Sequence, residues 1–161
     1  MRTRNWLAAL AVGVAIAAVV VGLMQKPAAP EVQATDLSGR PFSLAALHGH
    51  PVLIDFWATT CPGCVQEMPH LVEFYRQYHP DGLELVAVAM NYDDAAQVRK
   101  FAAEQGLPFT VVIDSTGDIA HAFGDIHLTP TAFLIDAQGR IAQQIIGDPD
   151  FADLGRRVKA G

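Results

Sequence analysis

The segment Asp55-Phe-Trp-Ala-Thr-Thr-Cys61-Pro-Gly-Cys64 decides the fold of this 161-residue chain. It joins the apolar run of residues 51–57 to an amphipathic stretch over residues 62–78. The first run is rich in β-forming side chains and predicts a strand buried on both faces, and the second predicts a helix. A C-x-x-C pair at such a junction, beside a β–α–β pattern, is typical of a thioredoxin-like redox site.

The position of Cys61 predicts a reactive thiol. At a helix N-terminus, unpaired backbone N–H groups and the helix dipole favour the thiolate, and in such settings the pKa of a cysteine falls from ~8.5 to ~3.5–7.5. Cys64 lies one turn further on and can attack a mixed disulfide to release the partner. A disulfide between such close residues constrains the unfolded chain little. We therefore expect redox chemistry, without a cofactor or a metal, rather than a structural crosslink.

The other elements are predicted from hydrophobic periodicity and turn residues. Residues 32–36 and 41–44 flank a Ser-Gly turn and predict a hairpin. Asp93 or Asp94 can cap a helix that ends at Gln105. Further strands are expected over residues 83–90, 109–113, 131–135 and 140–146, with short helices near His121 and over 151–159. This order predicts an α/β fold with a mixed central sheet, flanked by helices, in which the last hairpin adds antiparallel strands at one side.

The N-terminus predicts a membrane anchor. Residues 6–24 carry no charge, and as a helix they would be about 28 Å long, close to the hydrocarbon thickness of a bilayer. Arg2 and Arg4 precede them, which places the N-terminus in the cytoplasm and the domain across a bacterial inner membrane, on its periplasmic side. A cleaved signal peptide is the alternative, but its apolar core usually spans only ~7–15 residues. We expect a single-pass signal anchor.

Domain organisation and charge follow from this division. We expect an anchor over residues 1–26, a Pro/Ala-rich linker over residues 27–31 and one domain over residues 32–161. The whole chain has a formal charge of −6, and residues 27–161, with 8 basic and 17 acidic side chains, have −9. Such a domain lacks the basic surface that nucleic acids require.

The stretch LIDFWATTCPGCVQEMPHL (residues 53–71) resembles the active-site segment of the TlpA/ResA-like thiol–disulfide oxidoreductases of the thioredoxin superfamily. The motif Glu67-Met68-Pro69 and the later motif Thr129-Pro130-Thr131 carry the same resemblance, which covers roughly residues 32–159. It implies a thioredoxin-like fold and a cis proline at Pro130 that faces the dithiol. Beside Pro130, the backbone of Thr129 would then be offered to an extended substrate segment, and we expect Trp57 to contribute to substrate binding while it packs under the active-site loop.

Two acids are candidates for proton transfer with Cys64. Glu67 lies three residues after Cys64 on the same helix face and matches the family acid. Asp55 lies in an apolar strand, where an unpaired carboxylate is costly to bury. Buried acids have raised pKa values, which suits proton transfer near neutral pH. The alternatives are a solvated helix glutamate and a structural acid bonded to nearby backbone.

Two positions depart from the family pattern. Thr60 stands where the family often has tryptophan directly before the first cysteine, and this puts partner specificity in question. Asp55 stands where many TlpA-like proteins have asparagine, while thioredoxins keep a buried acid there. The chain therefore combines two acids, Asp55 and Glu67, beside one dithiol.

The resemblance implies an enzyme that reduces disulfides of exported proteins, with apocytochrome c as a possible substrate and a transmembrane thiol carrier as electron donor. Two other functions stay open from the residues alone. A copper or other soft-metal chaperone would use Cys61, Cys64 and a histidine. A peroxiredoxin-like peroxidase would use Cys61, although the residues before it do not match that pattern in register. The sequence does not set the reduction potential.

Overall fold

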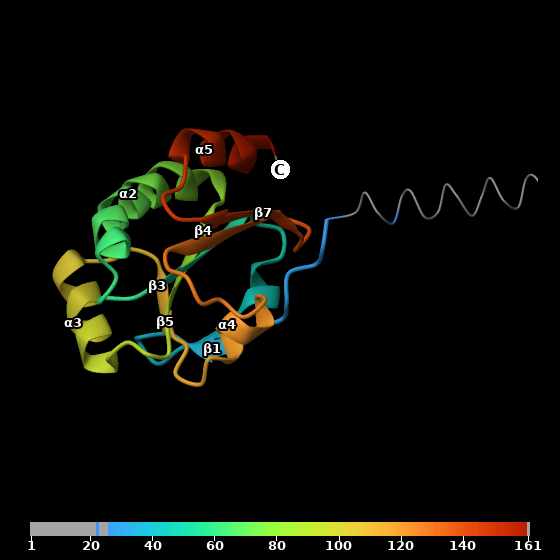
Figure 1. The fold of residues 1–161 in the computed structure, drawn as a ribbon. Coiled ribbons are helices and arrows are strands. Elements are labelled where there is room, and N and C mark those ends of the chain that lie inside the picture. Colours follow the sequence, from blue (N-terminus) through green and yellow to red (C-terminus); the bar gives the residue numbers. More distant parts are fainter. Residues whose placement is uncertain (1–21, 23–25, 161) are drawn as a thin grey trace, which may run out of the picture.

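A five-stranded mixed sheet forms the centre of the protein (Figure 1). The computed structural model describes residue 22 and residues 26–160. The strands are β3 (Val52–Trp57), β4 (Glu84–Ala89), β5 (Thr110–Ile113), β6 (Thr131–Ile135) and β7 (Ile141–Ile146), in the order β5-β4-β3-β6-β7. β3, β4 and β5 run parallel, while β6 pairs antiparallel with β3 and β7 with β6. The predicted mixed sheet with a hairpin at one side is confirmed.

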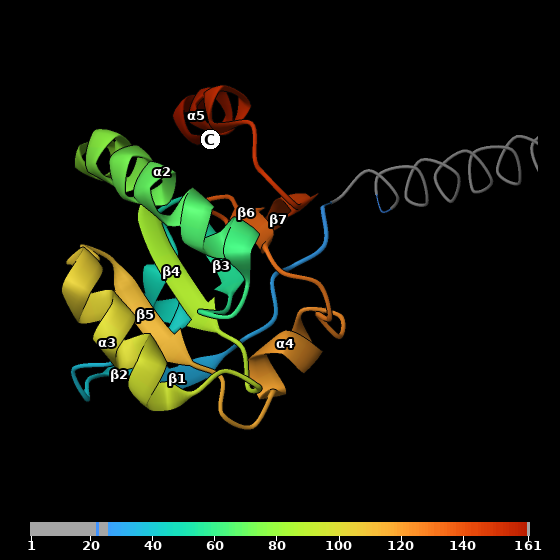
Figure 2. The ribbon, with the colours of Figure 1, turned by 60° about the vertical axis from the view of Figure 1, so that its left-hand side comes forward.

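Helices cover both faces of this sheet. They are α2 (Pro62–Tyr78), α3 (Ala95–Gln105), α4 (Asp118–Ala122) and α5 (Phe151–Ala160), with 3₁₀ turns at Leu44–Leu47 and His79–Asp81. α2, α3 and α5 pack on one face, and α4 with the first 3₁₀ turn packs on the other (Figure 2). Every residue of β3 is buried, because this central strand has neighbours on both edges and helices on both faces. The predicted doubly buried strand is confirmed.

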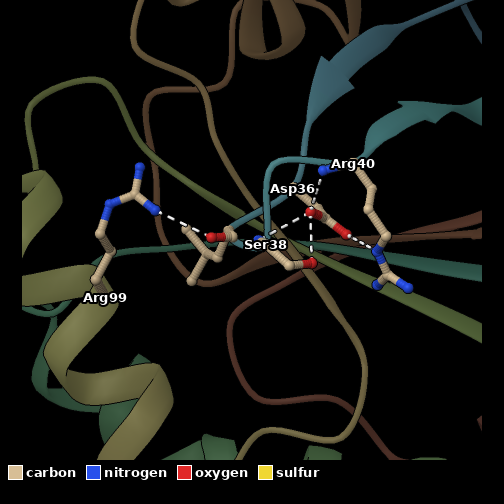
Figure 3. A network of polar contacts seen from close by, with 5 residues as sticks. Asp36, Ser38, Arg40 and Arg99 are labelled. Atoms are coloured by element: carbon tan, nitrogen blue, oxygen red, sulfur yellow. Dashed lines mark hydrogen bonds and ion pairs between the residues drawn. The ribbon is translucent and has the colours of Figure 1, made fainter.

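A small hairpin closes the far edge of the sheet, next to β5. Its strands β1 (Gln33–Thr35) and β2 (Pro41–Ser43) pair antiparallel. The Asp36 carboxylate organises the turn by accepting hydrogen bonds from the backbone and side chains of Ser38 and Arg40 (Figure 3). Arg99 of α3 donates to the Leu37 carbonyl over 3.2 Å. The Leu37 N–H donates to the Val111 carbonyl of β5 over 3.0 Å, so the hairpin is attached to the edge strand as well as to α3.

Residues 26–29 lie against the turn between β6 and β7. The Ala29 N–H donates to the Gly139 carbonyl over 2.8 Å, and the Ile141 N–H donates to the Pro27 carbonyl over 2.8 Å. The Lys26 ammonium lies 3.1 Å from the Asp136 carboxylate. Part of the predicted linker therefore pairs with the domain.

The predicted anchor over residues 6–24 lies outside the described residues, apart from Gly22. Among the helices that the structure does describe, none has the length and apolar character needed to cross a membrane.

Candidate active site

The two cysteines form a disulfide at the start of α2. Cys61 is the N-cap residue of this helix, with extended backbone angles, and its sulfur accepts a hydrogen bond from the Cys64 N–H over 3.2 Å. The predicted position of Cys61 at the helix N-terminus is confirmed. Cys61 is partly exposed, whereas Cys64 is buried. A substrate can therefore reach only the first sulfur.

The loop before β6 lies against this disulfide. The Thr129–Pro130 peptide bond is cis, as the resemblance implies. The Cys61 sulfur lies 3.5 Å from the Thr129 carbonyl oxygen, so the thiol of the reduced form has an acceptor there. Gly63, between the two cysteines, lies next to Pro130, since a Cβ atom added to Gly63 would be 3.8 Å from Pro130 Cδ. The structure thus brings together the dithiol and the Thr129-Pro130 pair, which are far apart in the sequence.

Asp55 and Glu67 are both buried on the face of the sheet that α2 covers, and Glu67 lies three residues after Cys64 on that helix. Asp55 lies on β3 between Ala87 of β4 and Ala132 of β6, whose small side chains leave it without a polar neighbour across the strands. Asp55 Oδ1 and both carboxylate oxygens of Glu67 have no hydrogen-bond partner among the described residues. These acids are not the solvated or backbone-bonded groups of the alternative interpretation.

Burial shifts the pKa values of both acids upward. It raises the pKa of Asp55 well above its ordinary value, and the nearby charge of Glu67 adds to this effect. Burial also raises the pKa of Glu67 to about 7, with a further contribution from the charge of Asp148. Because the charged form of each acid is disfavoured, one or both can hold a proton near neutral pH. This is the property that a proton acceptor for Cys64 needs.

Of the two roles predicted for Trp57, the structure shows the packing under the active-site loop and corrects the contribution to substrate binding. Its side chain is 0% exposed and packs in the core, with its ring centroid 5.2 Å from that of Phe101 on α3. It therefore supports the active-site loop from below and offers no surface to a substrate. The physical reason is its position on β3, where alternate residues point into the helix-covered face.

Exposed apolar side chains surround the dithiol. Among the described residues, four large hydrophobic side chains are exposed, and three of them flank the site: Val65 on α2, Tyr92 after β4 and Leu128 before the cis proline. Val65 lies on α2 but outside the buried stripe of this helix, which passes through Cys64, Glu67 and Met68. Tyr92 and Leu128 were missed. Their only sequence signal is that each lies in a loop next to the end of a predicted strand.

Comparisons with known proteins agree with this geometry. The Redoxin family matches residues 24–156. A thiol-disulfide oxidoreductase ResA from Bacillus thuringiensis subsp. konkukian is 39% identical over 131 residues, which are 81% of this chain and 75% of the relative. The chain belongs to the Redoxin family. It is a ResA-like thiol–disulfide oxidoreductase of thioredoxin-like fold, with its redox-active disulfide between Cys61 and Cys64.

Solved structures of the same kind superpose well on this oxidoreductase. A thiol:disulfide interchange protein of the thioredoxin family from Chlorobium tepidum is 31% identical, with a TM-score of 0.77, and the match covers 84% of this chain and 96% of that one. A thioredoxin-like protein from Neisseria meningitidis is 36% identical, also with a TM-score of 0.77, and the match covers 84% and 90% of the two chains.

The histidines of this family member form no metal site among the described residues. All six are exposed. Within residues 26–160, no group of three or more His, Cys, Asp or Glu side chains is placed to hold a metal ion.

Proposed function

We propose that this oxidoreductase works as a disulfide reductase of exported proteins, anchored in a bacterial inner membrane with its domain on the periplasmic side. One observation supports the chemistry above all. A partly exposed Cys61 caps the helix that carries the buried Cys64, and the same face of the sheet buries Asp55 and Glu67, with Asp55 Oδ1 and both Glu67 oxygens lacking hydrogen-bond partners among the described residues. This arrangement supplies an attacking thiolate, a resolving thiol and a proton acceptor.

The reduced enzyme transfers two electrons in two steps. The Cys61 thiolate attacks one sulfur of the substrate disulfide, a new S–S bond forms, and the other substrate sulfur leaves as a thiolate that takes a proton from water. The Cys64 thiol then gives its proton to the carboxylate of Asp55 or Glu67. The resulting thiolate attacks the Cys61 sulfur and breaks the mixed disulfide. The second substrate thiolate leaves, and the Cys61–Cys64 disulfide seen in the structure is the product.

The surface around Cys61 suits an extended, partly unfolded polypeptide. Val65, Tyr92 and Leu128 form an apolar rim, and the backbone of Thr129 lies beside the reactive sulfur. A substrate segment can pair with that backbone as an added strand while its apolar side chains contact the rim. Newly exported proteins that have not finished folding present such segments, and apocytochrome c is one candidate.

The location and the electron donor are parts of this proposal. The uncharged run of residues 6–24, with Arg2 and Arg4 before it, supports an anchor whose domain lies outside the cytoplasm. A disulfide product must be reduced again for turnover, so a dithiol donor is required. For an anchored domain outside the cytoplasm, a transmembrane thiol carrier is the matching class of donor.

Insulin reduction driven by dithiothreitol tests the exchange chemistry. We expect turnover by the wild-type protein and none above background for Cys61→Ser, because the variant has no exposed thiol. Cys64→Ser should instead accumulate a mixed disulfide at Cys61, visible by mass spectrometry. Full turnover by Cys61→Ser would refute the assignment of the nucleophile.

The direction of electron flow and the anchor need separate measurements. A reduction potential against glutathione close to that of thioredoxin, about −270 mV, is expected of a reductase, whereas a value near −120 mV would identify an oxidant. Retention in the membrane pellet after an alkaline carbonate wash is expected of an anchored protein. Quantitative release by that wash would contradict the anchor.

A further inference from the structure

The loop between β4 and α3 runs beside the segment that carries the nucleophile. β3 and β4 are parallel neighbours, so their carboxyl ends lie at the same edge of the sheet and their loops leave it side by side. The Met90 N–H donates to the Trp57 carbonyl over 3.0 Å, which extends the pairing by one step beyond the strands. The chain then turns into α3, whose N-cap is Asp94.

Asp93 holds the segment before Cys61. Its carboxylate accepts the Thr59 N–H over 2.5 Å and the Thr59 hydroxyl over 2.6 Å. The same carboxylate also accepts the N–H of Asp94, the N-cap residue of α3, over 3.0 Å. Asp93 is buried, so water competes little for these hydrogen bonds. The sequence predicts either Asp93 or Asp94 as the cap of this helix, and the structure shows that Asp94 is the cap, through the N–H groups of Ala96 and Gln97.

The distance along the chain from Thr59 to the reactive sulfur is short. Residues 58–61 form a tight turn, in which the Cys61 N–H donates to the Ala58 carbonyl over 3.1 Å. Ala58 is fixed in the core at the end of β3, and Thr59 is fixed by Asp93. With both residues held, the backbone of Cys61 has little freedom to leave its N-cap position.

The neighbouring residue Tyr92 makes a second connection, to the opposite side of the site. Its hydroxyl lies 3.3 Å from the Thr129 hydroxyl, and the two share a hydrogen bond. The Thr129 carbonyl in turn lies 3.5 Å from the Cys61 sulfur. Two consecutive residues of one loop therefore contact the segment that carries the nucleophile and the segment that carries the cis proline.

We propose that Asp93 and Tyr92 are positioning residues for thiol–disulfide exchange: Asp93 fixes Thr59 and so Cys61, and Tyr92 fixes Thr129. Together they set the placement of the attacking sulfur relative to the backbone that pairs with the substrate. Neither residue exchanges electrons or protons with the substrate. This inference rests on the exchange reaction proposed above and adds the groups that hold its geometry.

The test compares two isosteric variants with a matched control in the same loop. Thr59→Val removes the hydroxyl that donates to Asp93 and keeps the charge of Asp93. Tyr92→Phe removes only the hydroxyl that meets Thr129. Asp94→Ala removes the cap of α3, which also costs hydrogen bonds of this loop, but it leaves both active-site contacts intact. Each variant is assayed for kcat and KM in insulin reduction and for unfolding in urea.

We expect Thr59→Val to lower kcat about tenfold with KM within twofold of wild type, since misplacing a reacting group by 1 Å can cost up to ~100-fold. Tyr92→Phe should lower kcat about threefold. Combined, the two variants should show the product of the single effects. Asp94→Ala should lower the urea midpoint while kcat stays within twofold of wild type. Thr59→Ser, which restores the hydroxyl, should recover the wild-type kcat.

Several outcomes would overturn the proposal. If Thr59→Val kept the wild-type kcat, or if Asp94→Ala lost as much kcat as Thr59→Val, Asp93 would serve only stability. A loss in Thr59→Val that Thr59→Ser does not recover would also contradict it. The failure of exchange itself is distinguishable, because it would appear as an absence of insulin turnover in the wild-type protein.

Discussion

The carboxylates at the two ends of β3 behave in opposite ways. At the end where the strand begins, Asp136 lies in the β6–β7 turn and accepts hydrogen bonds from the Arg140 N–H over 2.9 Å and from Lys26 over 3.1 Å. Burial alone would raise the pKa of Asp136, but these partners more than offset it, and the net shift is downward. Towards the dithiol end, Asp55 and Glu67 are buried without such partners, and their pKa values are raised.

The difference relates the hydrogen-bond partners of each acid to its role. An acid with donors around it stabilises a turn, and its charged form is favoured. An acid that is buried without donors makes the charged form costly, so it reduces stability near neutral pH, but it becomes able to accept and release a proton there. The buried acids at the dithiol end therefore lower the stability of the fold but enable proton transfer, whereas the paired acid at the opposite end stabilises the fold.

The largest effect is expected when both acids at the dithiol end are neutralised. Asp55→Asn combined with Glu67→Gln should slow the resolving attack by Cys64 about 100-fold at pH 7, because general base catalysis typically contributes 10²–10⁴-fold. Rapid mixing of the reduced protein with a disulfide substrate measures this step, and the mixed disulfide should accumulate. Asp136→Asn is the control and should react like wild type. Unchanged kinetics in the double variant would exclude both acids as proton acceptors.

The second effect concerns stability and pH. The folded-state pKa of Glu67, about 7, lies above its ordinary value of 4.5, so the folded protein is fully stable with respect to this group below pH 4.5 and loses stability as pH rises through 7. Because glutamine does not ionise, the Glu67→Gln variant should not show this loss, which amounts to about 2–3 kcal/mol in the free energy of unfolding at pH 8. Urea unfolding of the oxidised protein at pH 5 and pH 8 measures it.

Glu73→Gln, on the exposed side of the same helix, is the matched control for that experiment and should leave the pH dependence unchanged. An identical stability difference between pH 5 and pH 8 in wild type and Glu67→Gln would show that Glu67 is charged in the folded state without cost.

The third effect concerns Asp36, whose contribution to stability depends on pH in the opposite sense to that of Glu67. Hydrogen bonds from the Arg40 backbone and the Ser38 hydroxyl lower the pKa of Asp36 from 3.8 to about 2. Its contribution to stability is therefore present above pH 3.8 and lost as pH falls through 2. Asp36→Ala should lower the melting temperature by a few degrees at pH 7 and by less at pH 2. A constant difference at both values would contradict the charge-dependent role.

The smallest effect is expected at Lys26. Its side chain is half exposed, and exposed ion pairs contribute about 0–1 kcal/mol. Lys26→Ala should lower the free energy of unfolding by less than about 1 kcal/mol, and added salt should reduce the difference. A loss of several kcal/mol in chemical unfolding would mean that residues 26–29 are an essential part of the domain and not an attached segment.

Much of the fold could be predicted because its signals are local. The apolar run before Cys61, the helix from Pro62 and the Asp136–Gly139 turn each depend on neighbours in the chain, and the structure has these elements at the expected places. The alternation of strands and helices then restricts the sheet to few topologies. The capping position of Cys61 follows from the same local pattern.

The sequence by itself determined the strand, the helix and the sulfur at their junction, because hydrophobic period and helix capping act over a few residues. Only the tertiary structure decided that Asp55 and Glu67 are buried without partners, that Trp57 is covered, and that Asp93 holds Thr59 instead of capping α3. A pKa or a hydrogen bond depends on which atoms meet in space, and that becomes defined only when the strands have paired and the helices have covered them.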